Sequence, residues 1–188
     1  MHNLIKIYYF IDEFNRGEIQ KLHRNIVLIY RNYNRNYNSK LIKKIKNFCL
    51  KHNRKLYISN SLKLALNLNL DGLYLPSFNK ICNYKNLNSK KDFEIVGSAH
   101  NLIQIKNKEE QGCTSIFIAP IFKTRKSSFF LDTTRFNLLA KNTQKKVIAL
   151  GGINRWNFKR LRLGKIDGFA SISWIKKNRP KNIGRFLK

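Results

Sequence analysis

The sequence has little cysteine, proline and glycine, and each shortage argues against a class of protein. The three cysteines, Cys49, Cys82 and Cys113, are odd in number and widely spaced, which argues against a disulfide framework and against a zinc cluster. We expect them to be reduced thiols packed as small apolar residues. Three prolines and nine glycines in 188 residues leave no linker or low-complexity tract. The sequence therefore predicts one domain over residues 1–188, large enough for a hydrophobic core.

Long hydrophobic runs are also missing. The longest apolar run is far shorter than the roughly 20 residues that a membrane-spanning helix needs. The apolar stretch from Leu4 to Ile11 contains Lys6, and Asp12 and Glu13 follow it where a signal peptide would have a small-residue cleavage site. We therefore expect this stretch to be the first strand of a cytoplasmic protein that has no membrane partner.

Acidic residues are few: 10 Asp and Glu stand against 38 Lys and Arg, for a formal net charge of +28. Such an excess is found in nucleic-acid-binding proteins. Here, however, the charges occur in almost every segment, and Lys, Asn and Ile are abundant together, as A/T-rich codons would produce. We expect weak, non-specific binding to polyanions at low salt, and we treat a specific nucleic-acid function as the less favoured interpretation.

Short apolar runs alternate with longer amphipathic segments along the whole chain. Strands are expected at Ile5–Ile11, Ile26–Tyr30, Lys55–Ile58, Gly72–Leu75, Phe93–Gly97, Ser115–Ile118, Lys146–Leu150 and Gly168–Ser171. Between them lie helical patterns, such as Leu41, Ile45, Phe48 and Cys49 on one face, and Trp156, Lys159, Leu161 and Leu163 on another. Eight strands alternating with helices predict an α/β fold, a single short (β/α)8 TIM barrel, with an open doubly wound sheet as the alternative.

In such a barrel, ligands bind at the C-terminal ends of the strands. The residues at these ends are mainly amides, hydroxyls and cations, which suit a phosphate-bearing ligand better than carboxylate-based hydrolysis. The last two strands end at Gly151-Gly152 and at Ser171-Ile172-Ser173. Glycine lets backbone N–H groups approach an anion closely, so we expect a phosphate site there, although the glycines also fit a simple tight turn.

Motifs over most of the chain resemble those of the thiamine phosphate synthase family and its thiazole tautomerase relatives. The resemblance is densest between Ile95 and Ile175. The similar segments are Tyr8–Asp12, Tyr30–Tyr33, Asp71–Pro76, Ile95–Asn101, Ala119–Thr124, Val147–Ile153 and Ile172-Ser173. Their shared order and spacing are more specific than any one motif alone.

The resemblance implies an activity, a cofactor and a set of site residues. The family couples an aminopyrimidine methyl diphosphate to a thiazole phosphate, releasing diphosphate, with Mg2+ and cationic side chains neutralising the leaving group. By position, Arg31 and Ser98 would be catalytic, although a one-residue gap leaves Ala99 as a competing alignment. The residues implied in substrate and phosphate binding are Asn60, Thr124, Arg125, Lys126, Gly151, Gly152, Ile172 and Ser173. The implied partners are small phosphorylated substrates, and the oligomeric state stays open.

The sequence departs from the family pattern where the metal would bind. Tyr33 replaces a lysine, Ser59-Asn60 replaces an Asn-Asp pair, and Pro76-Ser77 occupies the place of a later aspartate. Asn60 is left as a weak candidate Mg2+ ligand, because Mg2+ favours charged oxygens. Pro120 stands where tautomerases have histidine. Three hypotheses remain: a synthase with a degenerate metal site, a relative that only binds phosphorylated ligands, and a basic nucleic-acid-binding protein.

Overall fold

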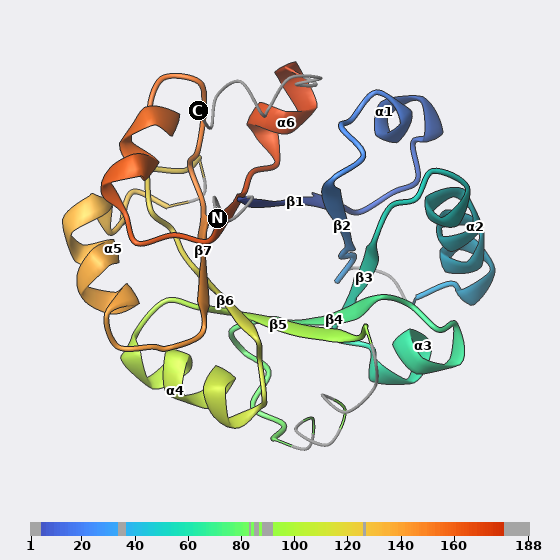
Figure 1. The fold of residues 1–188 in the computed structure, drawn as a ribbon, viewed down its shortest axis with the longest axis horizontal. Helices are drawn as coiled ribbons and strands as arrows, with labels where there is room; N and C mark the ends of the chain where they lie inside the picture. Colours follow the sequence, from blue (N-terminus) through green and yellow to red (C-terminus); the bar gives the residue numbers. More distant parts are fainter. Residues whose placement is uncertain are drawn as a thin grey trace.

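The structure, a computed structural model, is a closed barrel of eight parallel strands in the order β1 to β8 (Figure 1). It describes residues 5–33, 37–82, 84, 87, 92–125 and 127–178. The strands are β1 (Lys6–Ile11), β2 (Ile26–Tyr30), β3 (Leu56–Ser59), β4 (Gly72–Leu75), β5 (Glu94–Ala99), β6 (Ser115–Ile118), β7 (Lys146–Leu150) and β8 (Gly168–Ala170). Because β8 pairs with β1 and closes the sheet, the TIM-barrel prediction is confirmed and the open doubly wound sheet is wrong.

Helices form a ring around the outside of the barrel (Figure 1). They are α1 (Arg16–Gln20), α2 (Ser39–Lys51), α3 (Leu62–Asn67), α4 (Leu102–Glu110), α5 (Asp132–Ala140), the 3-10 helix η2 (Phe158–Leu163) and α6 (Ser173–Asn178). Asparagine side chains cap α1, α2 and α4: Asn15 accepts a hydrogen bond from the Glu18 N–H, Asn38 accepts from Lys40 and Leu41, and Asn101 accepts from Gln104. These caps fix where the three helices start.

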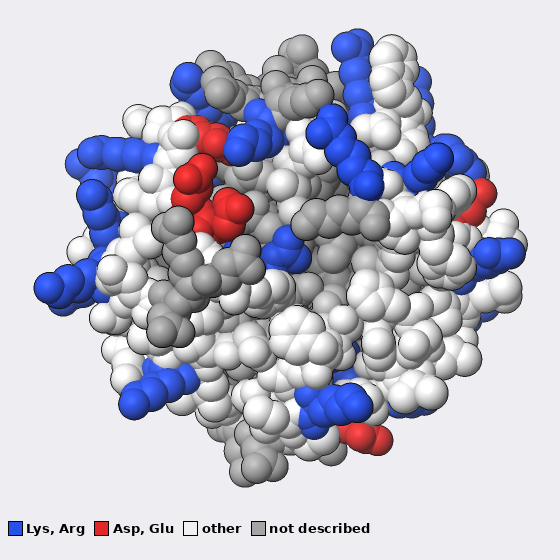
Figure 2. Space-filling view, turned by 180° about the vertical axis from the view of Figure 1, so that it is seen from behind, with Lys and Arg blue, Asp and Glu red and all other residues white. Residues whose placement is uncertain are grey.

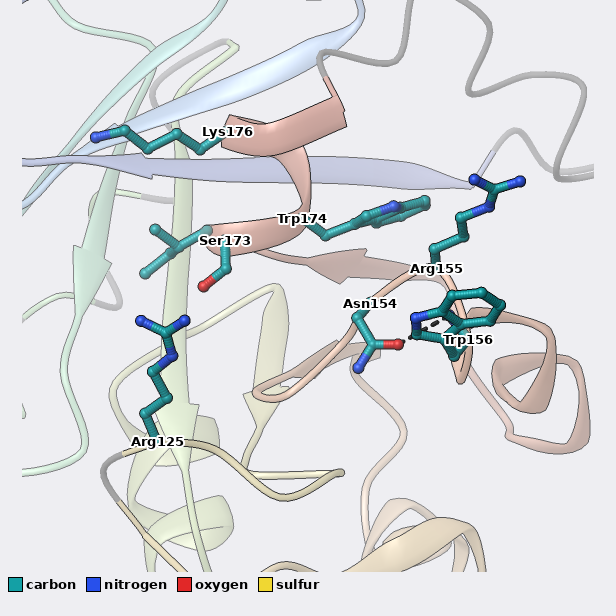
Figure 3. A pocket seen from close by; sticks show the side chains of 8 residues that line it. Arg125, Asn154, Arg155, Trp156, Ser173, Trp174 and Lys176 are labelled. Atoms are coloured by element: carbon teal, nitrogen blue, oxygen red, sulfur yellow. Dashed lines mark hydrogen bonds between the residues drawn. The ribbon is translucent and has the colours of Figure 1, made fainter.

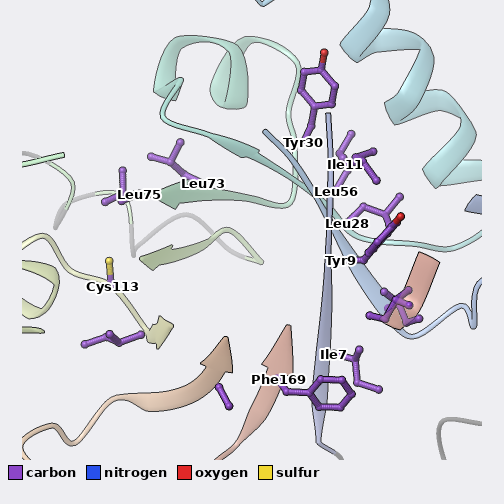
Figure 4. Close-up of a cluster of buried hydrophobic side chains, with 14 of the residues drawn as sticks. Ile7, Tyr9, Ile11, Leu28, Tyr30, Leu56, Leu73, Leu75, Cys113 and Phe169 are labelled. Atoms are coloured by element: carbon purple, nitrogen blue, oxygen red, sulfur yellow. The ribbon is translucent and has the colours of Figure 1, made fainter. Parts of the chain in front are cut away.

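Alternation along the strands divides the core into two layers. Residues on one side of each strand face the helices, among them Ile7, Leu28 and Leu73 (Figure 4). Residues on the other side fill the barrel interior, where the ring centroids of Tyr8 and Phe117 lie 4.8 Å apart and those of Phe10 and Tyr74 lie 5.1 Å apart. Because side chains alternate with a period of two, the interior side of each strand continues into the mouth of the barrel.

The segment after β7 differs from the expected α-helix. Phe158 and Leu161 of η2 are buried, whereas Trp156 and Leu163 are 88% and 69% exposed. In a 3-10 helix residues three apart share a face, so Phe158 and Leu161 face the core together. The Asn154 side chain accepts hydrogen bonds from the N–H groups of Trp156 and Asn157, and so turns the chain before the helix begins.

Two smaller expectations also change. The buried face of α2 is formed by Ile42, Ile45, Phe48 and Cys49, so Leu41 lies at its half-buried edge. Cys49 and Cys113 are buried free thiols, as expected, but Cys82 is exposed. Cys82 lies in the segment between β4 and β5, which does not pack it into the core.

Candidate functional site

The loops after β7 and β8 lie side by side on one rim of the barrel. Leu150 pairs with Ala170 at the ends of the two strands, and the Ser171 hydroxyl donates a hydrogen bond to the Ile153 carbonyl at 3.0 Å. All eight strands run parallel, so the residues that follow β2, β5 and β6 open on the same rim. The residues predicted for the site are thereby brought to one end of the barrel.

The two glycines after β7 are required by packing. Gly151 and Gly152 have φ values of +98° and +68°, a region that favours glycine. A Cβ on Gly151 would lie 2.8 Å from the Pro120 Cβ, and one on Gly152 would lie 2.4 Å from the Phe122 carbonyl oxygen. The loop after β6 crosses here, with the Ile121 N–H donating to the Leu150 carbonyl at 2.9 Å. This crossing accounts for both glycines, so their role in phosphate binding stays a prediction.

A cavity of about 600 Å³ opens beside these loops (Figure 3). Its lining residues are Arg125, Asn154, Arg155, Trp156, Ile172, Ser173, Trp174 and Lys176. Arg125 comes from the loop after β6, whereas Ser173 and Lys176 come from α6 (Figure 3). Three residues predicted for phosphate binding, Arg125, Ile172 and Ser173, thus line one cavity. Lys176 was missed in the sequence, although its place three residues after Ser173 on a helix could have indicated it.

The centre of the mouth brings Arg31, Tyr74 and Ser98 together. The Arg31 guanidinium carbon lies 4.4 Å from the Phe10 ring centroid and 5.7 Å from that of Tyr33. Burial raises the pKa of the Tyr74 phenol to about 12, while a hydrogen bond with Ser98 and the positive charge of Arg31 act in the opposite direction. Both residues predicted to be catalytic therefore interact with one buried phenol.

The competing alignment at Ala99 is disfavoured by strand geometry. Ala99 packs in the layer between the barrel and the helices, together with Ile95. Val96, two residues before Ser98, belongs to the interior layer. Since side chains alternate along a strand, Ser98 is the residue of this pair on the interior side.

Two further predicted residues, Asn60 and Thr124, already have partners within the protein. Asn60 is exposed, its φ is +56°, its N–H donates to the Tyr74 carbonyl at 2.8 Å, and its Oδ1 accepts a hydrogen bond from Asn79. The Thr124 hydroxyl accepts a hydrogen bond from the Ser127 N–H at 3.1 Å and closes a turn. Lys126 lies outside the described residues.

The residues in the mouth do not fit a carboxylate-held Mg2+ ion. Within the described part of the chain, no three His, Cys, Asp or Glu side chains are grouped closely enough to hold a metal. The oxygen of Asn60, the weak candidate ligand, faces the Asn79 amide. Asp12 and Glu13 follow β1 and line a small neighbouring cavity with Glu18, and Ile172 and Lys176 belong to the lining of both cavities. Hard cations favour several charged oxygens in one place, and the rim does not offer them at Asn60.

Comparison with known proteins places the chain in a family. The thiamine monophosphate synthase model matches residues 22–175. A thiamine-phosphate synthase from Pelagibacter ubique is 32% identical over 155 residues, which are 78% of this chain and 73% of that protein. The chain belongs to the thiamine monophosphate synthase family. The resemblance seen in the sequence motifs is therefore confirmed.

Other members of the thiamine monophosphate synthase family differ in length or retain mainly the fold. Thiamine-phosphate synthase of Prochlorococcus marinus strain AS9601 is 30% identical over 70% of this chain, but the chain spans only 37% of that protein. Thiamine phosphate pyrophosphorylase from Pyrococcus furiosus superposes with a TM-score of 0.72 at 18% identity, covering 93% of this chain and 88% of that one. The barrel is thus shared at low sequence identity.

Positive charge is dispersed on the face drawn in Figure 2. Lys and Arg side chains appear on several sides of this face, whereas most visible Asp and Glu side chains gather in one cluster. The described side chains of this face form no single positive groove, which is the pattern of a solvated surface. Within the ranges that the structure describes, no helix has the length and apolar content needed to cross a membrane.

Proposed function

We propose that the chain binds two phosphorylated thiamine precursors and couples an aminopyrimidine methyl diphosphate to a thiazole phosphate, releasing diphosphate. One observation carries the proposal: the cavity lined by Arg125 and Ser173 opens on the same rim as Arg31 and Ser98. Two anion-binding regions on one rim suit a reaction that joins two phosphorylated substrates. We propose residues 1–188 as a single barrel domain for this task.

The thiazole phosphate is assigned to the cavity beside β7 and β8. Arg125 and Lys176 supply positive charge, and Ser173 supplies a hydroxyl donor. The backbone N–H groups around Gly151, Gly152 and the Ile172-Ser173 pair lie at the ends of the same two strands. Arg155 is a third cation of the lining. Since phosphate carries up to two negative charges, a pocket with three cations and several donors favours it over neutral ligands.

The diphosphate of the second substrate is assigned to Arg31 in the centre of the mouth. The rings of Phe10 and Tyr33 flank its guanidinium, which limits the motion of the charge. When the bond between the pyrimidine methylene carbon and the diphosphate oxygen breaks, negative charge develops on the leaving group. Arg31 stabilises that charge electrostatically, and Ser98 positions the substrate beside it. The thiazole nitrogen then forms the new bond to the methylene carbon.

A second candidate is a relative that keeps the binding cavity but does not perform the coupling. The observation in its favour is the lack of a carboxylate group at Asn60, where Mg2+ would assist the departing diphosphate. In this case the cations of the rim bind phosphate groups without completing the catalytic site.

An assay of the purified chain with both precursors, following thiamine phosphate with and without Mg2+, tests the proposal. Product formation above that of an Arg31→Ala variant supports the synthase function. If no product forms while both phosphorylated ligands still bind, the synthase function is refuted and the second candidate stands. If neither ligand binds, both are refuted.

A further inference from the structure

We infer that Asn60 acts as a hydrogen-bond donor to a phosphate oxygen, and that a buried chain of polar groups running through Asn79, Gln111 and Lys108 holds it in that orientation. The inference rests on the proposed function, because it assigns a role in binding the diphosphate. It replaces the metal-ligand role that the family resemblance implies for this position. Its basis is a set of hydrogen bonds whose direction can be worked out group by group.

The chain starts at Lys108 on α4, whose side chain is fully buried. Its Nζ donates to the Gln111 Oε1 at 2.7 Å and to the Asn79 backbone carbonyl at 2.9 Å. Gly97 leaves the space for it, because a Cβ there would lie 2.6 Å from the Lys108 Cδ. A lysine ammonium can only donate, so Gln111 must turn its oxygen towards Lys108 and its amide nitrogen away.

The amide of Gln111 is then surrounded by acceptors. Its Nε2 donates to the Ile81 carbonyl at 2.8 Å, to the Asn79 carbonyl at 3.0 Å and to the Asn79 Oδ1 at 3.1 Å. The backbone N–H of Ile81, which cannot accept, donates to the same Oδ1 at 2.9 Å. Two donors therefore fix the Asn79 oxygen on this side, and they place the Asn79 Nδ2 on the other.

The orientation of Asn60 follows from that of Asn79. The Asn79 Nδ2 donates to the Asn60 Oδ1, so the oxygen of Asn60 faces inwards and its own Nδ2 group faces the opposite way. Asn60 is solvent-exposed at the end of β3, so this donor is turned to the rim. An outward amide N–H suits an anionic oxygen and is unsuited to a metal cation.

The neighbouring groups indicate which acceptor Asn60 meets. Its backbone N–H donates to the carbonyl of Tyr74, and the positive charge of Arg31 acts on the Tyr74 phenol, where it opposes the rise in pKa that burial causes. The strands β2, β3 and β4, which carry these residues, are adjacent in the barrel. Asn60 thus adds a neutral donor on the same rim as the cation proposed to hold the diphosphate. Asn79, Gln111 and Lys108 are positioning residues in this arrangement.

Binding of inorganic pyrophosphate, measured by calorimetry in EDTA and again in Mg2+, tests the inference. Asn60→Asp keeps the oxygen that accepts from Asn79, but it replaces the outward donor by a negative charge, which repels pyrophosphate by itself. The neutral Asn60→Gly, which suits the positive φ of this position, removes the donor without adding charge. Asn79→Asp keeps the acceptor for Ile81 and Gln111 but loses the donor to Asn60, so Asn60 is expected to reverse its amide. Asn60→Gly and Asn79→Asp should bind pyrophosphate about tenfold or more weakly in EDTA than the unchanged chain, the loss expected for a hydrogen bond to a charged group. Asn25→Asp, an exposed change of equal charge at the opposite end of the barrel, should bind as the unchanged chain does.

The outcomes separate this inference from the proposed function. If the unchanged chain binds pyrophosphate and Asn60→Gly binds it equally well in EDTA, the donor role is wrong and the proposed function stands. If Asn60→Asp binds more tightly only when Mg2+ is present, position 60 serves a metal and the inference is overturned. No binding by the unchanged chain would overturn both. Should Asn79→Asp fail to fold, as checked by thermal unfolding, Asn60→Gly decides alone.

Discussion

Replacing Lys108 by methionine should remove a pH dependence of stability that this lysine gives the barrel. Its side chain is fully buried. Its hydrogen-bond partners are the Asn79 backbone carbonyl and the Gln111 amide oxygen, and neither of them is a carboxylate. Burial lowers the pKa of Lys108 from 10.5 to about 8, a shift that the charges of Cys113 and Cys82 only partly oppose. In the unfolded chain the same lysine keeps its ordinary pKa.

The sign of the effect follows from proton counting. Between about pH 8 and pH 10.5 the unfolded chain holds a proton on Lys108 that the folded chain has released, so the free energy of unfolding rises with pH in this window. A pKa shift of this size corresponds to about 3 kcal/mol of unfolding free energy. The folded chain has this gain above the window and lacks it below pH 8. Burial raises the pKa values of Tyr8 and Tyr57 above their ordinary value, so these phenols decrease stability above pH 10 in both proteins.

The measurement is urea unfolding of the unchanged chain and of Lys108→Met at pH 7, 8, 9 and 10. The unfolding free energy of the unchanged chain, measured relative to that of Lys108→Met, should rise by about 2 kcal/mol from pH 7 to pH 10. Lys106→Met, an exposed change on the same helix, is the matched control and should give a difference that does not vary with pH. Parallel pH profiles for the unchanged chain and Lys108→Met would refute the reasoning, because they would mean that Lys108 keeps its ordinary pKa despite burial.

Three further changes test other parts of the molecule. Ser173→Asp should weaken thiazole phosphate binding by charge repulsion, and unchanged affinity in calorimetry would place the phosphate elsewhere. Gly152→Ala should destabilise the barrel by about 2 kcal/mol or more in urea unfolding, since the new Cβ meets backbone atoms at a positive φ; a smaller cost would mean that the crossing loop moves easily. The third change concerns Glu94. Burial raises the pKa of its carboxyl, but hydrogen bonds and positive charges from Lys6 and Lys55 lower it by more, so the pKa of Glu94 lies below its ordinary value of 4.5. Stability should therefore fall as the pH drops through and below 4.5, and Glu94→Gln should lose this dependence; if it does not, other carboxylates cause the acid sensitivity.

The strands could be predicted because each has a simple local cause. Four of them, including Ile26–Tyr30 and Lys146–Leu150, have the expected bounds. Each is a short run of apolar residues buried on both faces and bounded by polar residues, which is the pattern of a parallel barrel strand. The segment after β7 could not be predicted equally well, because Trp156 and Leu163 carry the same apolar signal as Leu161 and only packing distinguishes them.

The site residues also divide into those that the sequence could locate and those that it could not. Arg31 and Ser98 could be located because the rule for strand ends needs only the strands themselves. Lys108 and Asn79 could not, because a lysine in a helix of mixed charge and an asparagine in a loop are typical of solvated surface. One signal was present: Gly97 interrupts a buried strand, and a glycine there indicates that another group approaches closely.

Two carboxylates at the N-terminal ends of the strands are held by a constraint that position 60 lacks. Asp71 and Asp167 accept hydrogen bonds from the backbone N–H groups of Leu56 and Val147, at the N-terminal ends of β3 and β7. Replacing these carboxylates would leave strand N–H groups without acceptors, so the fold itself opposes their loss. No such constraint holds at Asn60, whose oxygen meets a side-chain amide, and a neutral residue there preserves the contact. If the rim holds its ligands through cations and neutral donors alone, its affinity for pyrophosphate should fall steadily with salt and respond little to EDTA.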